Sequence, residues 1–203
     1  MSSLLFYSDA QEVIIATDTL LHYPDGAAPG YSSKAIAIPH LRMIVAGTGS
    51  AALFNRWIGL VNEQGFALDV DAVDAHAPKP LQSLWQELNN QFPSLRDQTA
   101  TIYHFGFSEK TGKIHGYSYR SKSNFASEWL AYGLGVKPPL ADNADIDLSS
   151  FPDCAVEIMQ AQEMQENQKA VDRVYIGGSV QINHLTRSGF SIYSLGELAR
   201  ASR

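Results

Sequence analysis

Strand-like segments of this chain come in adjacent pairs joined by short turns, and this pattern constrains the fold more than any other feature. Leu4–Ser8 and Val13–Thr19 are rich in apolar and β-branched residues, and only the polar segment 9–12 separates them. Two such runs with a short connection predict an antiparallel hairpin. Lys34–Ile38 and Met43–Ala46 form a second pair around a turn that contains a proline. Antiparallel sheets are therefore expected, not alternating βαβ units.

Helical patterns occur in blocks between the groups of strands. Apolar residues recur at helical spacing from Leu53 to Val61, Pro80 opens a second such stripe, and Pro152–Lys169 carries a third. The sequence contains no internal repeat and no linker-like segment. The expected fold class is therefore α+β, with two sheets packed face to face, helices outside them, and a single domain over residues 1–203.

The other segments are assigned from local pattern alone. Thr99–Phe107 alternates and Lys113–Tyr119 follows a turn, which predicts a third hairpin. Further expected strands are Asn124–Tyr132, Val174–Ile176, Ser179–Leu185 and Phe190–Tyr193. Two segments, Gly65–Lys79 and Lys137–Ser150, are expected to be irregular, and Leu195–Ala201 is expected to close the chain as a short helix.

Composition excludes several classes of function. The formal net charge is −6 and no cluster of lysine and arginine exists, so we expect no nucleic-acid partner. Cys154 is the sole cysteine, which excludes an internal disulfide. The six histidines lack the spacing of metal ligands, so neither a metal nor another cofactor is expected. The apolar runs near the start are only as long as strands, which predicts no membrane contact and a cytoplasmic location.

Three residues near the start stand in an even register. Asp18 follows Ser2 by sixteen positions and Lys34 follows Asp18 by sixteen. If Met1 is removed, Ser2 carries a free α-amine, whose reference pKa of about 7.7–8.0 allows it to accept the proton of the serine hydroxyl. A nearby Lys34 ammonium disfavours protonation of that amine, and Asp18 would hold Lys34 in place. This set of groups is one way to build a hydrolase.

Each of these residues also has a simpler interpretation. Ser2 can be part of a polar chain start, Asp18 can cap a turn at a strand end, and Lys34 can be a solvated lysine at a strand edge. Gly47 and Gly49 can serve the turn alone. If Met1 is retained, the nitrogen of Ser2 is an amide, which cannot act as a base.

Several motifs together resemble those of proteasome β-type subunits, in the N-terminal-nucleophile (Ntn) hydrolase superfamily, and of the small bacterial proteasome-like peptidases. They are Ala16-Thr17-Asp18, Lys34, Ala46-Gly47-Thr48-Gly49-Ser50, the Gly133–Gly135 region and Tyr175-Ile176-Gly177-Gly178. The order of expected strands and helices agrees with that family along the whole chain. The register of Ser2, Asp18 and Lys34 fits the family without a gap.

The resemblance implies a four-layer αββα sandwich and a set of catalytic roles. Ser2 would take the nucleophile position, with Asp18 and Lys34 as its electrostatic partners. The backbone N–H of Gly47 would help to form the oxyanion hole, with a neighbouring residue of the Gly47–Gly49 turn as the alternative. The resemblance also implies a homo-oligomer, because members of the family assemble into rings or stacked oligomers, and leaves open an ATPase partner.

Four positions depart from the pattern of that family. Leu20 stands where a basic residue is common, Leu134 replaces a small hydroxyl residue between two glycines, and Ile176 replaces a serine before the late glycine pair. Arg173 occupies the position of a late aspartate, and Asp172 is one place early. These departures remove helpers of the catalytic group.

Two functions follow from the sequence. The first is an N-terminal-nucleophile hydrolase that cleaves peptide or small amide substrates through Ser2 after removal of Met1. The second is a catalytically inactive proteasome-like subunit that acts as an oligomeric scaffold. The departures favour the second, whereas the retained Asp18 and Lys34 favour the first.

Overall fold

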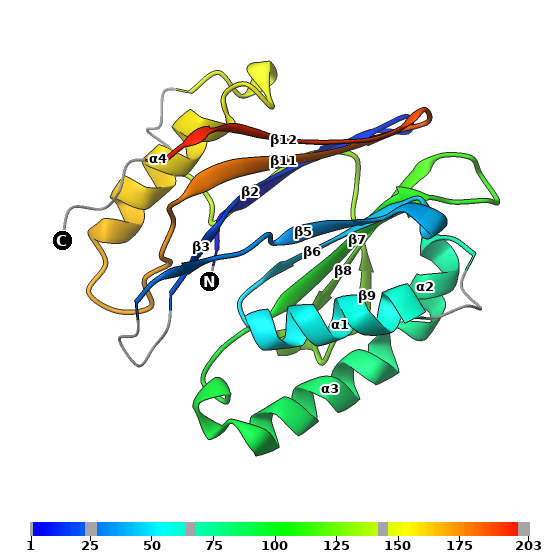
Figure 1. The fold of residues 1–203 in the computed structure, drawn as a ribbon, viewed down its shortest axis with the longest axis horizontal. Helices are drawn as coiled ribbons and strands as arrows, with labels where there is room; N and C mark the ends of the chain where they lie inside the picture. The colour runs from blue at the N-terminus through cyan, green and yellow to red at the C-terminus, as the bar shows by residue number, and fades with distance from the viewer. Residues whose placement is uncertain (1, 23–27, 64–67, 142–145, 199–203) are drawn as a thin grey trace.

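The computed structural model describes residues 2–22, 28–63, 68–141 and 146–198. Two antiparallel sheets lie one over the other, and helices lie beside their outer faces (Figure 1). The fold class is therefore α+β, as the paired strands predict. Each sheet has five strands among the described residues.

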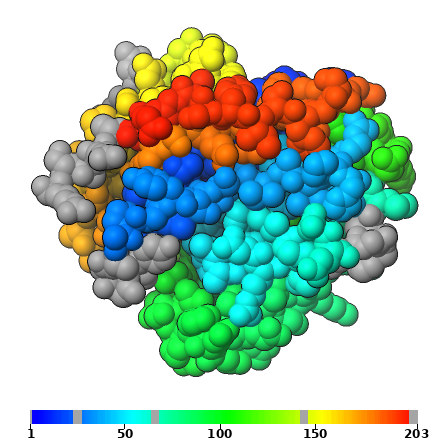
Figure 2. Space-filling view, viewed as in Figure 1, coloured from blue at the N-terminus to red at the C-terminus, as the bar shows by residue number. Residues whose placement is uncertain are grey.

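The first sheet contains both ends of the described chain. Its strand order is β10-β1-β2-β11-β12. The strands are β1 (Leu4–Ser8), β2 (Val13–Asp18), β10 (Gly133–Lys137), β11 (Ser179–Thr186) and β12 (Gly189–Glu197). β1 pairs with β2 and with β10, so that Leu4 lies opposite Thr17 on one side and Lys137 on the other. Figure 2 shows β12 along one border of the molecule, where residues 191–194 are exposed.

The second sheet has the order β5-β6-β7-β8-β9, so its strands are neighbours in the order of the sequence, with three helices between β6 and β7. They are β5 (Ala35–Ile38), β6 (Met43–Thr48), β7 (Thr101–Phe107), β8 (Ile114–Arg120) and β9 (Ser127–Trp129). The short strands β3 (Leu20–Leu21) and β4 (Gly30–Tyr31) form a separate pair. β7 is buried along its whole length, because a layer covers each of its faces.

The helices cover the outer face of each sheet. α1 (Ala51–Glu63), α2 (Val70–His76) and α3 (Pro78–Gln91) lie beside the second sheet, and α4 (Ala155–Asn167) lies beside the first (Figure 1). One-turn 3₁₀ helices occupy Pro39–Leu41, Pro93–Leu95, Ser121–Ser123 and Leu148–Ser150. No helix in the described ranges is long and apolar enough to cross a membrane.

Apolar side chains form one cluster between the sheets and one under each group of helices. Alternation along β7 divides its residues between two of these clusters. Tyr103, Phe105 and Phe107 face the first sheet, while Ile102 packs toward α1 and α3. The aromatic residues of β7 are therefore core residues, as their alternation predicts.

Local patterns misplace elements that depend on distant partners. The segment 133–137, part of which was expected to open a loop, is the strand β10, because it pairs with β1. A Cβ atom at Gly135 would lie 2.3 Å from the ring of Phe6. Glycine has a low strand propensity, but here its lack of a side chain lets Phe6 of β1 pack against the backbone of β10. The expected strand Asn124–Tyr132 is reduced to β9 (Ser127–Trp129).

Three further expectations are corrected. Within Gly65–Lys79, expected to be irregular, the described residues include α2, whose first turn Asp69 caps by accepting from the Ala72 N–H, and α3 starts at Pro78. Val174–Ile176 is not a strand, although both of its apolar ends are buried in the core. Within Leu195–Ala201, Leu195–Glu197 belongs to β12, and residues 199–201 lie outside the described part of the chain.

The turn between β6 and α1 requires glycine at position 49. Its φ is +94°, and a Cβ atom there would meet the Thr99 carbonyl oxygen at 1.9 Å. We expect Gly49→Ala to lower the free energy of unfolding by about 2 kcal/mol or more, since the backbone must shift. The matched control is Gly59→Ala within α1, where a Cβ meets nothing within 4 Å and about 0.5–1 kcal/mol is gained. Urea unfolding of both variants tests this, and equal effects would contradict it.

A buried histidine under α1 predicts acid sensitivity. His104 of β7 is fully buried, its Nε2 accepts from the Trp57 indole N–H at 2.8 Å, and burial lowers its pKa to about 3. In the unfolded chain His104 becomes protonated as the pH falls through about 6.5, whereas in the folded protein it stays neutral at that pH. The free energy of unfolding therefore decreases as the pH falls. Between pH 6.5 and 4.5 this loss is about 2 kcal/mol.

The comparison is with His104→Gln, whose amide oxygen also accepts from Trp57 but does not titrate in this range. We expect its unfolding free energy, measured by urea titration at several pH values, to fall less steeply between pH 6.5 and 4.5. The exposed His40→Gln serves as control and should keep the wild-type slope. Parallel slopes for wild type and His104→Gln would refute the assignment.

Candidate active site

Asp18 joins three separate segments at the end of β2. Its carboxylate is fully buried and accepts hydrogen bonds from Lys34 Nζ at 2.7 Å and from the backbone N–H of Ser3 at 3.0 Å, both on Oδ1. Its Oδ2 accepts from the backbone N–H of Gly177 at 3.1 Å. Three donors satisfy a buried carboxylate that would otherwise be costly to desolvate.

Lys34 immediately precedes β5, and its side chain is almost completely buried against Asp18. Burial lowers the pKa of the Lys34 amine, while the charge of Asp18 opposes that change. Burial likewise raises the pKa of the Asp18 carboxyl, and Lys34 and the two backbone N–H groups oppose it. The opposite charges of Asp18 and Lys34 thus offset part of the cost of burying each other.

The local sequence explains why Gly177 reaches Asp18. β2 and β11 pair so that Val180 lies opposite Asp18, and the Gly177-Gly178 turn directly precedes β11. Gly178 has a φ of +78°, and a Cβ atom there would lie 2.4 Å from Thr19 Oγ1. The glycine pair therefore lets the backbone approach β2 closely.

Ser3 connects the start of the chain to α4. It is fully buried, and its hydroxyl donates to Gln162 Oε1 at 2.6 Å. Gln162 is also fully buried, and its amide Nε2 donates to the carbonyl of Pro138, next to β10. Sequence reasoning missed Gln162 because one glutamine in a Gln- and Glu-rich helix carries no signal. Both the backbone and the side chain of Ser3 are fixed, and this places Ser2 beside it.

A pocket brings together the predicted residues Ser2, Lys34 and Gly47. Its volume is about 330 Å³, including space open to solvent. The other lining residues are Leu21, Ser32, Ser33, Thr48, Gly49, Ser50, Ala51, Phe54 and Asn55. Asp18 does not line the pocket but lies directly behind Lys34. Met1 is outside the described residues.

The backbone N–H of Gly47 is already engaged. It donates to the Lys34 carbonyl at 3.0 Å, which ties the segment before β5 to β6. The turn that follows, Thr48–Ser50, leads into α1, where the positive end of a helix dipole faces the pocket. This turn overlaps the Gly47–Gly49 turn, of which a neighbouring residue was the predicted alternative for the oxyanion hole.

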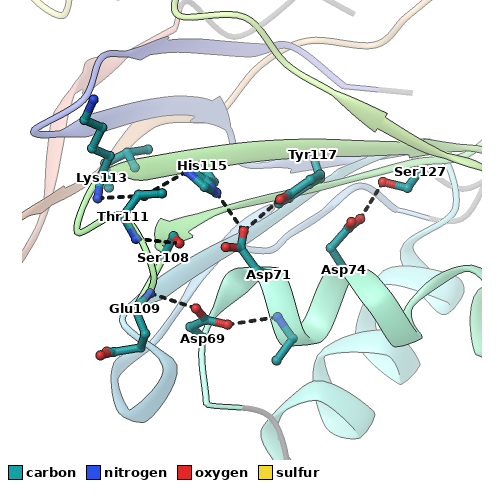
Figure 3. A network of polar contacts seen from close by, with 12 residues as sticks. Asp69, Asp71, Asp74, Ser108, Glu109, Thr111, Lys113, His115, Tyr117 and Ser127 are labelled. Carbon is teal, nitrogen blue, oxygen red and sulfur yellow. Dashed lines mark hydrogen bonds and ion pairs between the residues drawn. The ribbon is translucent and has the colours of Figure 1, made fainter.

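A second polar network lies on the far side of the second sheet, between α2 and β8 (Figure 3). His115 Nδ1 and Asp71 Oδ1 are 2.7 Å apart, His115 Nε2 lies 3.0 Å from Thr111 Oγ1, and Tyr117 donates to the same Asp71 oxygen at 2.7 Å. Asp74 accepts from Tyr119 at 2.6 Å. The carboxylates of α2 are thus shared with tyrosines of β8, and the network anchors that helix.

The geometry of this network does not match a metal site or an open nucleophile. Among the residues that the structure describes, no group of three or more His, Cys, Asp and Glu side chains is arranged to hold a metal ion. Thr111 Oγ1 accepts from the Lys113 backbone N–H at 3.3 Å, so the hydroxyl is part of its own turn. We therefore place the candidate active site at the pocket of Ser2.

Comparison with known proteins supports the fold. No family model matches the sequence, and no curated protein is significantly similar to it. Among solved structures, the fold is similar to Anbu (ancestral beta-subunit) from Yersinia bercovieri, with a TM-score of 0.63 and 13% identity. The match covers 97% of this chain and 87% of that chain. At this identity the likeness shows a proteasome-like fold alone.

The family assignment from motifs is corrected by these comparisons. The motifs around Asp18, Lys34 and Gly47 resemble those of proteasome β-type subunits and bacterial proteasome-like peptidases, yet no family model matches. An identity of 13% to a structural neighbour does not make the chain a member. Membership of the N-terminal-nucleophile hydrolase superfamily was therefore wrong as an inference from short motifs, each of which is weak alone.

The buried ion pair predicts strong coupling between Asp18 and Lys34. Asp18→Asn leaves the Lys34 ammonium buried without a counter-charge, so we expect the free energy of unfolding to fall by about 3–5 kcal/mol. Asp18→Asn combined with Lys34→Met removes the unpaired charge and should be less destabilised than Asp18→Asn alone.

The control is the exposed pair Arg56–Glu87, whose atoms are 3.9 Å apart. Glu87→Gln should change the unfolding free energy by less than about 1 kcal/mol. Urea unfolding of all variants gives the comparison. A double variant whose loss equals the sum of the losses of Asp18→Asn and Lys34→Met, each made alone, would show that the pair is not coupled.

Proposed function

We propose that this protein is an amide-bond hydrolase in which Ser2, freed by removal of Met1, is the nucleophile. One observation carries the proposal: Ser2 and Lys34 line the same pocket, and the carboxylate that binds Lys34 also binds the backbone of Ser3. The chain thereby holds a hydroxyl, the α-amine that removal of Met1 would free, and a buried cation in one place. The substrate is a peptide or small amide.

The reaction needs no group beyond the chain and water. The Ser2 hydroxyl attacks the amide carbonyl carbon while its proton passes to the α-amine. The carbon–nitrogen bond breaks as the α-ammonium returns that proton to the leaving nitrogen. Water then attacks the acyl ester while the α-amine accepts one of its protons. The ester bond breaks as the α-ammonium returns that proton to the Ser2 oxygen, which releases a carboxylic acid and restores Ser2.

Lys34 and Asp18 would act through charge. The positive charge of Lys34 disfavours protonation of the neighbouring α-amine, which keeps it available as a base near neutral pH. Asp18 would keep Lys34 oriented and partly compensate its desolvation. For the oxyanion, we propose the N–H groups of the turn Thr48–Ser50, because Gly47 already donates to Lys34.

The remaining expectations about the molecule stay proposals. We propose that residues 1–203 form one domain, that its layers make a four-layer αββα sandwich, and that the protein acts as a homo-oligomer in the cytoplasm. The two stacked sheets with helices outside each of them support the sandwich.

Intact mass followed by labelling tests the function. We expect the mass to lack Met1 and a serine-directed electrophile, such as a peptide boronate or β-lactone, to add once, at Ser2. Ser2→Ala should abolish the adduct, whereas Ser33→Ala, which alters another hydroxyl of the pocket, should retain it. Lys34→Ala should slow labelling on the order of 100-fold, and the exposed Lys113→Ala should not.

The second candidate is a non-catalytic subunit that serves as an oligomeric scaffold. The engaged Gly47 N–H favours it, and a buried ion pair can be purely structural. A retained Met1, or labelling that is equal in wild type and Lys34→Ala, would reject the hydrolase and favour the scaffold.

A further inference from the structure

Lys137 stands at the end of β10, beside the start of the chain. It lies opposite Leu4 in the pairing of β10 with β1. Paired residues share one face of a sheet, and Leu4 belongs to the cluster between the two sheets. The side chain of Lys137 therefore enters the space between the sheets, where it crosses to β7.

The ammonium of Lys137 contacts only neutral oxygen atoms. Nζ donates to Thr101 Oγ1 at 3.0 Å and to Tyr103 Oη at 3.2 Å, and it lies 5.6 Å from the centre of the Tyr103 ring. No carboxylate of the described ranges forms an ion pair with it. Lys137 is half-buried, so its charge is partly removed from water and has no counter-ion among the described residues.

Lys137, Thr101 and Tyr103 lie together and have hydrogen-bond donors without an acceptor among the described residues. An ammonium has three N–H bonds, and two of those on Lys137 are used. Thr101 and Tyr103 accept from Lys137, and within the described residues neither hydroxyl donates to any acceptor. Burial raises the pKa of Tyr103 to about 12, so its hydroxyl keeps its proton. One N–H and two O–H groups of these three neighbouring side chains are thus left to donate to an oxygen anion.

The nearby charges are positive on balance, although the whole chain carries −6. Arg120 lies opposite Thr101 in the pairing of β7 with β8, and its guanidinium binds Glu128 at 2.7 Å. Lys122 adds a further positive charge. Burial, and then the charges of Arg120 and Lys122, lower the pKa of Lys137 to about 8. An anion would relieve both effects.

This position adjoins the pocket of Ser2 by two routes. Leu4 is two residues after Ser2, which is about 7 Å along an extended chain. Thr101 lies opposite Thr48 in the pairing of β6 with β7, and Thr48 lines the pocket. Lys137 and Thr101 thus pair with residues that adjoin or line the pocket, which is the geometric basis for placing a second substrate group beside them.

We propose that Lys137, Thr101 and Tyr103 form a carboxylate-binding subsite, and that the preferred substrate is an amide with a carboxylate about one residue from the bond that is cleaved. The inference rests on the proposed function for the identity of the ligand as substrate. The binding of a carboxylate does not depend on turnover.

Binding is measured in the Ser2→Ala variant, which cannot cleave through position 2. NMR titration compares N-acetyl-Ala-Ala with its C-terminal amide. We expect the carboxylate form to bind about 10- to 100-fold more tightly, as for a charge-assisted hydrogen bond. Lys137→Met and Lys137→Gln should abolish this ratio, Lys137→Arg should retain part of it, and the exposed Lys113→Met should leave it unchanged.

Two sources of the carboxylate are separated by a second pair of probes. N-acetyl-Glu-amide and N-acetyl-Gln-amide differ only in a side-chain carboxylate. A preference for the first over the second, with none for N-acetyl-Ala-Ala over its amide, would identify an acidic side chain as the ligand. The reverse would identify the C-terminal carboxylate. Equal affinities within both pairs, or ratios that Lys137→Met retains, would overturn the proposal.

The pH dependence of the affinity ratio distinguishes a lysine that binds the carboxylate from a lysine with a purely structural role. Lys137 is charged below a pKa of about 8, so the affinity ratio should be present at pH 6.5 and decline as the pH rises through about 8. Arg120, Lys122, Glu128 and Tyr103 are the other charged or titratable groups near Lys137. A ratio that is constant from pH 6.5 to 9.5 would contradict the assignment.

The two proposals fail in different ways. If the wild type cleaves N-acetyl-Ala-Ala and its amide with equal kcat/KM and the binding ratios are one, the subsite is wrong and the hydrolase stands. If Ser2 is never labelled but the Lys137-dependent ratio is found, the carboxylate site stands and the hydrolase is wrong.

Discussion

The carboxylate of Asp18 is the contact on which the rest of the site depends. It binds the Lys34 ammonium, the backbone of Ser3 and the backbone of Gly177, which come from three distant parts of the sequence. Each donor offsets part of the cost of burying the charge, and no single donor would offset it all. The start of the chain, the edge of the second sheet and the turn before β11 therefore hold their positions together.

Much of the fold follows from short-range patterns, because hairpins and amphipathic helices are encoded by neighbouring residues. The pairs β1–β2 and β7–β8 and the helix α1 were predictable for this reason. The strand β10 was not, since Gly133 and Gly135 have low strand propensity and only the contact with β1 makes the segment extended. The secondary structure of such segments depends on pairing with strands that are distant in the sequence, and a single sequence does not reveal that pairing.

The candidate site likewise contains residues that the sequence predicts and residues that only the tertiary structure reveals. The register of Ser2, Asp18 and Lys34 led to residues that the structure brings to one place. Gln162 and Lys137 could not be found in this way, since a glutamine in a polar helix and a lysine before two prolines have ordinary explanations. The complete burial of Gln162 and the partial burial of Lys137, which only tertiary structure reveals, make them informative. The hydrogen bond from the Gly47 N–H to the Lys34 carbonyl likewise depends on the pairing of β5 with β6, which the sequence alone does not reveal.

The double anchoring of Ser3 has a practical consequence for the preparation of the protein. Ser3 is buried, with its amide held by Asp18 and its hydroxyl held by Gln162. An affinity tag fused before Ser2 would therefore begin at the pocket that Ser2 lines. Tagged and untagged preparations would differ at this pocket.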